Sequence, residues 1–300
     1  MFIDIHSHVY RIRPRISSGT PFCNVEQLLK RNDQLKIEYA VLLPIVSPEI
    51  YSPQAVEDIL EICERHPDRF VPYCNLDPRY GWNGPYTDLA KTVKEYKALG
   101  CKGVGEVMPN LRLDDPKVQN LFYAADQAEL PIVYDGSTQL DGDFGLYDDP
   151  GLPMLEYTLQ DFPKLKIFGH GPVFWSEIAR LNTVAERGCH MSARGFKVRL
   201  PKGPVEEEGT VPKLFRKYPN LHGDLSDCTA YNAIARDPEY GPRFLTEFQD
   251  RLYFGTDMTA PDMPVELDQL LLSWKQTGKI SEEVFRKIAY DNAAKLLDIH

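Results

Sequence analysis

The feature that most constrains the fold is a repeated alternation of short apolar runs with longer polar or amphipathic stretches along all 300 residues. The runs resemble strands, and the stretches between them resemble helices. Eight such runs alternating with helical patterns predict an α/β protein, a parallel (β/α)8 or TIM barrel. The runs lie at 2–6, 40–45, 70–76, 102–107, 131–135, 165–170, 221–226 and 252–257.

The stretches between the runs carry the spacing of amphipathic helices. Val56, Ile59, Leu60 and Cys63 stand at i, i+3, i+4 and i+7, so they line one face of a helix. Similar patterns predict five further helices, the last of which begins after Ser281 as its N-cap. Those helices cover 89–97, 118–125, 178–185, 264–276 and 281–297.

We interpret residues 1–300 as a single domain, because barrels of about 250 residues commonly form one and no linker, repeat or low-complexity segment interrupts the chain. A doubly wound open sheet is the alternative. No glycine-rich phosphate loop follows the first run, which disfavours the nucleotide-binding form of that fold. Long loops are expected at the C-terminal face of the barrel, at 9–24, 136–152, 188–210 and 227–243.

The composition of the chain limits which binding partners and which cellular compartment are expected. The net charge of −10 argues against nucleic acid or an anionic membrane, both of which need a basic face. No apolar run approaches the roughly 20 residues that span a bilayer, and no signal peptide precedes the first run. The six cysteines form no C-x-x-C pair and are expected to be reduced. We therefore expect a cytoplasmic protein that acts on a small molecule.

The clearest chemical motif is D-I-H-S-H at residues 4–8. Residues i and i+2 of a strand point to the same face, so His6 and His8 project side by side from a strand end. Two neighbouring imidazoles suit one divalent metal ion. They could instead cap the barrel mouth by bonding to loop carbonyls, but with Asp257 at the end of the eighth run we favour metal ligands.

Further ionisable residues end other runs. Glu106, Asp135, His170 and Asp257 stand at the ends of the fourth, fifth, sixth and eighth runs. The C-terminal ends of barrel strands meet at one mouth, so these side chains are expected to converge there. Imidazole and carboxylate together suit zinc, with manganese or iron also possible, and a catalytic site keeps one position open for water.

Each of these residues also has an ordinary structural interpretation. Asp257 could be an N-cap, but we favour a metal ligand that also shuttles a proton. Glu106 could pair with Arg112, but we favour a position at or beside the metal. His170 lies between two glycines that allow close approach of substrate, which favours a functional role over a buried core histidine. Asp135 could belong to an Asx turn, and its role stays open.

The remaining histidines carry less information. His66 precedes a proline at a helix end, His300 is the last residue, and His222 lies at the start of its strand, near the other face of the barrel. We interpret these three as structural. His190 lies in a long loop, where it could touch substrate although nothing in the sequence requires it.

Taken together, the motifs resemble the amidohydrolase superfamily, specifically its amidohydrolase-2 branch, which also holds zinc-dependent nonoxidative decarboxylases. The resemblance covers almost the whole chain, and it depends on the joint spacing of the motifs. They are D-I-H-S-H at 4–8, K-G-V-G-E-V at 102–107, L-P-I-V at 130–133, F-P-K-L-K-I-F-G-H-G-P-V-F-W at 162–175, Y-P-N-L-H-G-D-L-S at 218–226 and L-Y-F-G-T-D at 252–257.

The resemblance implies roles for particular residues. His6, His8 and Asp257 would be metal ligands, and His170 would lie beside the metal-bound water as acid, base or electrostatic stabiliser. In many relatives the fifth strand ends in a histidine ligand, whereas this chain has Asp135 there. Either Asp135 replaces that ligand, or Glu106 completes the shell. Barrels of this kind often pair, so we expect a homo-oligomer.

Three functions compete at this point. The first is a zinc- or manganese-dependent hydrolase of a small amide, ester or lactone, in which a metal-activated water attacks the carbonyl group and Asp257 moves the proton. The second is a zinc-dependent nonoxidative decarboxylase of an aromatic or unsaturated carboxylic acid, with Asp257 or His170 protonating the carbon. The third is a barrel that binds a ligand without turnover, which the departure at Asp135 motivates.

Overall fold

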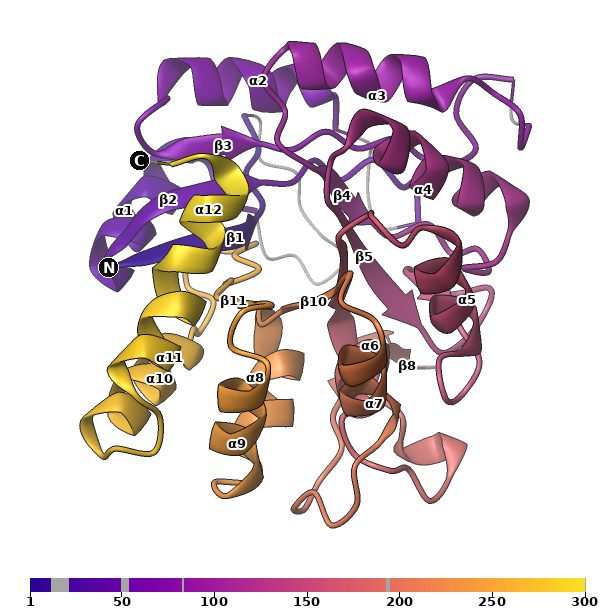
Figure 1. The fold of residues 1–300 in the computed structure, drawn as a ribbon. Helices are drawn as coiled ribbons and strands as arrows, with labels where there is room; N and C mark the ends of the chain where they lie inside the picture. Colours follow the sequence, from indigo (N-terminus) through magenta and orange to yellow (C-terminus); the bar gives the residue numbers. More distant parts are fainter. Residues whose placement is uncertain (12–21, 50–53, 83, 193–194, 300) are drawn as a thin grey trace.

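A computed structural model describes residues 1–11, 22–49, 54–82, 84–192 and 195–299 (Figure 1). Eight strands, all parallel to their neighbours, overlap the eight predicted runs, although the second strand begins and ends three residues before its predicted run. They are β1 (Phe2–Ser7), β2 (Ile37–Leu42), β3 (Phe70–Pro72), β4 (Val104–Val107), β5 (Ile132–Ser137), β7 (Ile167–His170), β10 (Leu221–Asp224) and β11 (Leu252–Tyr253).

The strands are joined into a ring. Hydrogen bonds order them as β1-β2-β3 and as β4-β5-β7-β10-β11. Two parallel bridges connect these sets, one between Cys74 and Val104 and one between Ser7 and Met258. The backbone N–H of Ile5 also donates to the carbonyl of Phe254, 3.1 Å away. This arrangement confirms the predicted TIM barrel.

Helices surround the barrel (Figure 1). Several begin where the sequence supplies a cap: the Asn24 side chain accepts from Gln27 N–H, Asp115 caps the helix that starts at Pro116, and Ser281 accepts from Val284 N–H as predicted. The helices are α1 (Val25–Leu35), α2 (Val56–Arg65), α3 (Leu89–Ala98), α4 (Pro116–Ala128), α5 (Pro153–Asp161), α6 (Gly171–Ser176), α7 (Thr210–Lys217), α8 (Asp227–Ala235), α9 (Tyr240–Glu247), α10 (Leu267–Gln276), α11 (Glu282–Arg286) and α12 (Asn292–Leu297), with a 3-10 turn at Val184–Glu186 and a π-helical segment at Lys287–Asp291.

Two local predictions are wrong. Residues 178–185 form no helix beyond the short 3-10 turn, because α6 starts directly after β7 at Gly171 and Pro172 and has already ended at Ser176. Ile178 and Ala179 are buried without helical geometry, and Val184 is exposed. The expected loop at 227–243 instead contains α8 and the start of α9.

The other expected loops carry short strands. In the described part, 136–152 includes β6 (Leu146–Tyr147), which pairs with the end of β5. The segment 188–210 includes an antiparallel hairpin of β8 (Cys189–Ser192) and β9 (Gly195–Arg199). Most of the first loop, at 12–21, lies outside the described residues.

The apolar core has two main parts. One fills the barrel interior with inward-facing side chains such as Ile5, Val41 and Phe168, together with Ala293 and Leu297 of α12. The other lies between the strands and the surrounding helices. His222 stacks on Phe168 inside the barrel, with ring centroids 5.0 Å apart, in agreement with its structural interpretation. Side chains therefore pack the interior, and chemistry is confined to a strand-end mouth.

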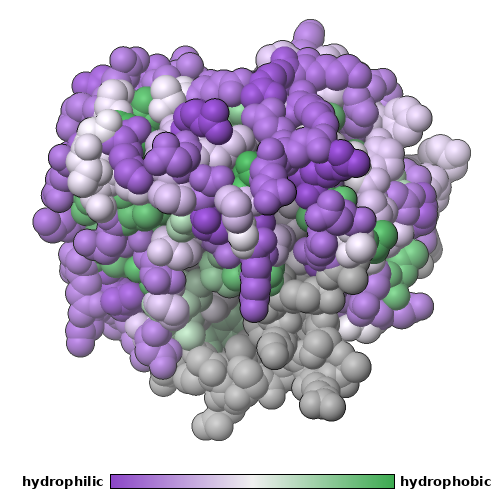
Figure 2. All heavy atoms as spheres, turned by 90° about the horizontal axis from the view of Figure 1, so that it is seen from below, coloured by the Kyte–Doolittle hydropathy of each residue, from purple (hydrophilic) through white to green (hydrophobic). Residues whose placement is uncertain are grey.

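The surface view of Figure 2 shows a mostly hydrophilic face on which apolar residues appear in scattered patches. Such dispersed apolar residues are ordinary on protein surfaces and do not by themselves mark an interface. Among the described residues, no helix has both the length and the apolar character required to cross a membrane.

Candidate metal centre

The first and last strands of the barrel together position three of the candidate ligands. The N–H of His8 donates to the carbonyl of Met258 at 3.0 Å, and the N–H of Asp257 donates to the carbonyl of His6 at 2.8 Å. These bonds hold the end of β1 against the segment that follows β11. As a result His6, His8 and Asp257 face one another, and Glu106 of β4 reaches the same point from across the barrel.

The donor atoms of this group have the spacing of a metal cage. His6 Nε2 and His8 Nε2 are 3.1 Å apart, and each lies 3.3 Å from Glu106 Oε2. Asp257 Oδ1 lies 3.5 Å from His6 Nε2 and 3.2 Å from His8 Nε2. A tetrahedral ion with bonds of about 2.0–2.1 Å holds its donors about 3.3–3.4 Å apart. The four side chains therefore fit a zinc-sized ion in both chemistry and spacing.

Hydrogen bonds on the far side of each ring orient the two imidazoles. His6 Nδ1 lies 2.6 Å from Asp224 Oδ2, and His8 Nδ1 lies 2.9 Å from the carbonyl oxygen of Leu43. Both partners accept hydrogen bonds, so each Nδ1 carries the proton and each Nε2 presents its lone pair to the centre. This is the tautomer that a metal ligand requires.

The charge around the rings favours a cation at the same point. Burial by itself would lower the pKa of His8, but hydrogen bonds to Asp257 and Glu106 raise it to about 9. Burial likewise opposes a charge on His6, yet Asp224, Glu106 and Asp257 raise the pKa of that imidazole well above its usual value. The carboxylates thus attract positive charge, which a divalent ion supplies in place of protons.

A second group of ionisable side chains adjoins the first through Glu106. His170 Nε2 lies 3.5 Å from Glu106 Oε1, and the donor atoms of Glu106, Asp135 and His170 lie within 4.8 Å of one another. Asp135 pairs in register with His170 across β5 and β7. Burial, and then the charge of Glu106, raises the pKa of Asp135 well above its usual value. The structure therefore brings Asp135 beside His170 and Glu106, whereas the group around His6 and His8 contains no oxygen from it.

Contacts at Nδ1 fix the orientation of the His170 ring. Its Nδ1 lies 3.0 Å from Ser226 Oγ and 3.4 Å from Asp224 Oδ2, and its ring centroid is 4.5 Å from that of His6. Nε2 consequently faces the cluster. The glycine that follows, Gly171, has φ +83°, and a Cβ there would collide with Asp135 Oδ1. Glycine at this position lets β7 turn tightly beside the site.

Sequence reasoning missed two buried carboxylates that organise the site. Asp224 ends β10 and bonds to His6, so the rule that identified the other strand-end residues also applies to it. Asp4 accepts from Ser7 Oγ and Thr256 Oγ, each at 2.6 Å, and from the N–H groups of His6 and Thr256. The available signal was an aspartate inside an apolar strand, two residues before the candidate ligand His6.

The sequence model of the amidohydrolase family Amidohydro_2 matches residues 3–299. The chain belongs to this amidohydrolase family. The family is an enzyme family that depends on metal ions and acts on small molecules, and the cage described above is the candidate metal site of this member. A search of curated proteins found no match.

Solved structures similar to this amidohydrolase share its fold at low sequence identity. A probable 2-pyrone-4,6-dicarboxylic acid hydrolase from Acinetobacter baumannii is 13% identical, with 99% of each chain covered and a TM-score of 0.58. A 2,6-dihydroxybenzoate decarboxylase from Rhizobium is 17% identical, with 100% of this chain and 99% of that chain covered and a TM-score of 0.57. A 5-carboxyvanillate decarboxylase from Novosphingobium aromaticivorans, complexed with manganese, is 15% identical, with 91% and 80% covered and a TM-score of 0.55.

Proposed function

We propose that this amidohydrolase is a metal-dependent hydrolase of a small amide, ester or lactone. The observation that carries the proposal is the four-donor cage in which one donor reaches solvent. The side chains of His6, His8 and Glu106 are at most 4% exposed, whereas that of Asp257 is 20% exposed. A small molecule entering from the mouth therefore meets Asp257 first.

A divalent ion, zinc or manganese, would be held by His6, His8, Glu106 and Asp257 and would take a water as a further ligand, since zinc can expand to five ligands. It would polarise a carbonyl group and lower the pKa of that water to about 7. Asp257 moves the proton. Its Oδ1 faces the two imidazoles, so Oδ2 is the oxygen that takes the proton of the attacking water. The water oxygen bonds to the carbonyl carbon, the bond from that carbon to nitrogen or oxygen breaks, and Asp257 returns the proton to the leaving atom.

His170 stabilises charge in this scheme. Ser226 and Asp224 hold its Nδ1 side, and its Nε2 side faces the cluster. An imidazole fixed in this way can donate to the oxygen that becomes negative when the carbonyl group is attacked. Asp135 pairs in register with His170, and its role in this scheme stays open.

A nonoxidative decarboxylase of an aromatic or unsaturated acid is the second candidate. What favours it is that decarboxylases of 2,6-dihydroxybenzoate and 5-carboxyvanillate share the fold over at least nine-tenths of this chain. In that reaction the carbon–carbon bond to the carboxylate breaks, carbon dioxide leaves, and the carbon takes a proton from Asp257 or His170. The same cage would hold the carboxylate and an adjacent hydroxyl group.

The deciding experiment starts with the metal content of purified protein and of a His6→Ala/His8→Ala variant. Protein reconstituted with zinc or manganese is then assayed on a panel of amides, esters and lactones, and on hydroxylated aromatic acids with detection of carbon dioxide. Hydrolysis that chelation abolishes, added metal restores and Asp257→Asn reduces by about a hundredfold or more supports the proposal. Carbon dioxide release without hydrolysis replaces it with the second candidate. Hydrolysis unaffected by both chelation and Asp257→Asn refutes it.

A further inference from the structure

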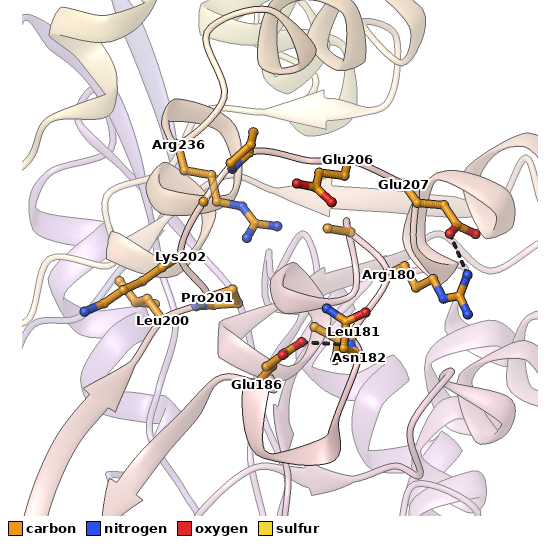
Figure 3. Close-up of a pocket in the computed structure, with 13 residues that line it drawn as sticks. Arg180, Leu181, Asn182, Glu186, Leu200, Pro201, Lys202, Glu206, Glu207 and Arg236 are labelled. Atoms are coloured by element: carbon orange, nitrogen blue, oxygen red, sulfur yellow. Dashed lines mark hydrogen bonds and ion pairs between the residues drawn. The ribbon is translucent and has the colours of Figure 1, made fainter.

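A groove and a patch of aromatic side chains lie away from the candidate metal ligands in the described part of the chain. The groove has a volume of about 690 Å³, and its walls are the segment after α6, the segment from β9 to α7, and the end of α8 (Figure 3). The three basic and three acidic side chains that line it balance one another, so the groove favours no charged class of ligand. The aromatic patch is more informative about a partner.

The aromatic patch consists of Tyr80, Trp82 and Tyr86, on the segment between β3 and α3, and Tyr123 of α4. Trp82 is 96% exposed and Tyr86 is 95% exposed, while the other two rings are about half exposed. Figure 1 shows the segment at the outer edge of the molecule, beside α4. Aromatic side chains usually bury about 150–250 Å² each, so these rings leave a large apolar area in water.

Contacts of the segment bring the aromatic side chains into one region. A Cβ on Gly81 would lie 2.8 Å from Thr87 Cγ2, so the two arms of the segment lie side by side. The carbonyl of Thr87 accepts from Asn120 Nδ2 of α4 at 2.7 Å. Tyr123 lies one helical turn from Asn120 on the neighbouring part of α4. The aromatic patch is therefore continuous across the segment and this helix.

Hydrogen bonds fix the backbone that carries the patch. Arg79 donates from Nη1 and Nη2 to the two carboxylate oxygens of Glu49, at 2.7 and 3.0 Å, and from Nε to Asp77 at 2.7 Å. The N–H of Tyr80 donates to the carbonyl of Asp77 at 2.8 Å. Rings on an ordered backbone lose little conformational freedom when they bind a partner, so the patch is suited to docking.

The charge of the patch favours a particular partner. None of the residues from Tyr80 to Thr87 is acidic or basic, and Arg79, directly before them, is paired with Glu49 and Asp77. The whole chain has a net charge of −10, so two copies repel one another on average. A second copy avoids this repulsion best where both surfaces are neutral, whereas a basic partner would gain no attraction from the patch.

The area of the patch also fits a second copy. At about 200 Å² for a fully exposed ring, the four side chains present about 600 Å². A two-fold axis through the patch would bury this area on both copies, about 1,200 Å² in total, which reaches the lower limit of a stable interface. Tryptophan and tyrosine are also among the residues that contribute most to affinity at the centre of an interface.

From these observations we propose that the aromatic patch is the interface of a homodimer, in which the four rings of one copy pack against those of a second copy. The interface is independent of the reaction proposed for the metal centre. Trp82 and Tyr86, the most exposed of the rings, lie at its centre.

Trp82 allows this interface to be observed directly. The chain has three tryptophans, and Trp175 and Trp274 are at most 5% exposed, so quenching of fluorescence by acrylamide reports mainly on Trp82. Quenching is measured on the intact protein over a range of concentrations, and sedimentation equilibrium gives the dissociation constant of the dimer. The variants are Trp82→Ala and Tyr86→Ala, with circular dichroism as the check on folding.

Leu99→Ala is the matched control. Leu99 is also a large apolar side chain, 64% exposed, but it lies at the opposite end of α3 from the patch, about 16 Å along the helix axis.

We expect wild type to dimerise at micromolar concentrations, and quenching of Trp82 to fall several-fold as the dimer forms. Because each substitution occurs twice in a two-fold interface, Trp82→Ala should raise the dissociation constant at least about a hundredfold and Tyr86→Ala at least about tenfold, whereas Leu99→Ala should change it by less than about threefold. This pattern would support the proposal, and either patch variant suffices if the other fails to fold.

Four outcomes would overturn the proposal. They are a wild type that stays monomeric at hundreds of micromolar, a dimer in which Trp82 remains fully open to acrylamide, a dimer unaffected by both patch variants, and an equal loss of affinity in Leu99→Ala. A monomer whose Trp82 becomes protected on addition of phosphatidylcholine vesicles would replace the second copy with a lipid surface.

Discussion

Replacing Asp224 by asparagine tests how the metal centre is oriented. In the structure Asp224 Oδ2 accepts from His6 Nδ1 at 2.6 Å, and Oδ1 accepts from the N–H of Ser226 at 3.0 Å. Asparagine has nearly the same shape but offers one acceptor oxygen and one donor amide. One of the two N–H groups must then face a donor. Either Ser226 loses its partner, or His6 shifts its proton to Nε2, the atom that would bind the metal.

The size of the effect follows from the position of this contact. Loss of a partner behind a histidine ligand typically weakens metal binding by 10–100-fold, which corresponds to about 1.4–2.7 kcal/mol. Asp224 is fully buried, and its bond to His6 is short and charge-assisted. We therefore expect Asp224→Asn to weaken zinc binding by about 30–100-fold.

Zinc affinity is measured by competition with a chromophoric chelator at neutral pH, with circular dichroism as the check on folding. Asp148→Asn is the matched control, since Asp148 is also a buried carboxylate that accepts from two N–H groups, those of Met154 and Leu155, and it touches no candidate ligand. A folded Asp224→Asn protein that keeps zinc affinity within about twofold of wild type would refute the reasoning. So would an equal loss in Asp148→Asn.

Three further outcomes are expected. Burial lowers the pKa of His222 to about 3, and the positive charges of Lys166 and Arg251 act in the same direction. Between about pH 6.5 and pH 3, therefore, the His222 imidazole is protonated in the unfolded chain and neutral in the folded one. As the pH falls through this range, the free energy of unfolding of the wild type decreases. Between pH 7 and pH 5 the free energy of unfolding, measured with urea, should therefore fall by about 2 kcal/mol less in His222→Phe than in wild type. An equal fall in the two proteins would contradict this. The purified Asp135→Ala variant should retain the metal ion proposed to bind His6 and His8, as measured by elemental analysis. A variant that contains no metal would show that Asp135 is a ligand. Gly171→Ala should lower the melting temperature more than Gly151→Ala, because both glycines have positive φ but only at position 171 does a Cβ collide with another residue, and equal shifts would argue against that collision.

The barrel, and the end of it at which the candidate site residues gather, could be predicted from the sequence. Eight apolar runs separated by helical patterns admit few architectures, and parallel strands of a barrel end at one mouth. For this reason His6 and His8 at the end of the first strand, Glu106 in the fourth and Asp257 after the eighth could be predicted to converge. The structure places their donor atoms within 4.8 Å of one another. The prediction of a helix at 178–185 was wrong because the spacing of apolar residues indicates which residues are buried, and residues can be buried without forming a helix.

The contacts between individual side chains could not be predicted, because they depend on how the elements pack in three dimensions. Asp224 bonds to a histidine that lies 218 residues away in the chain, and only the strand order of the closed barrel brings the two together. Asp135 lies beside His170 because β5 and β7 pair in one particular register. The physical reason is that periodicity along a strand or helix sets the direction of a side chain, whereas strand register and helix packing set distances between side chains.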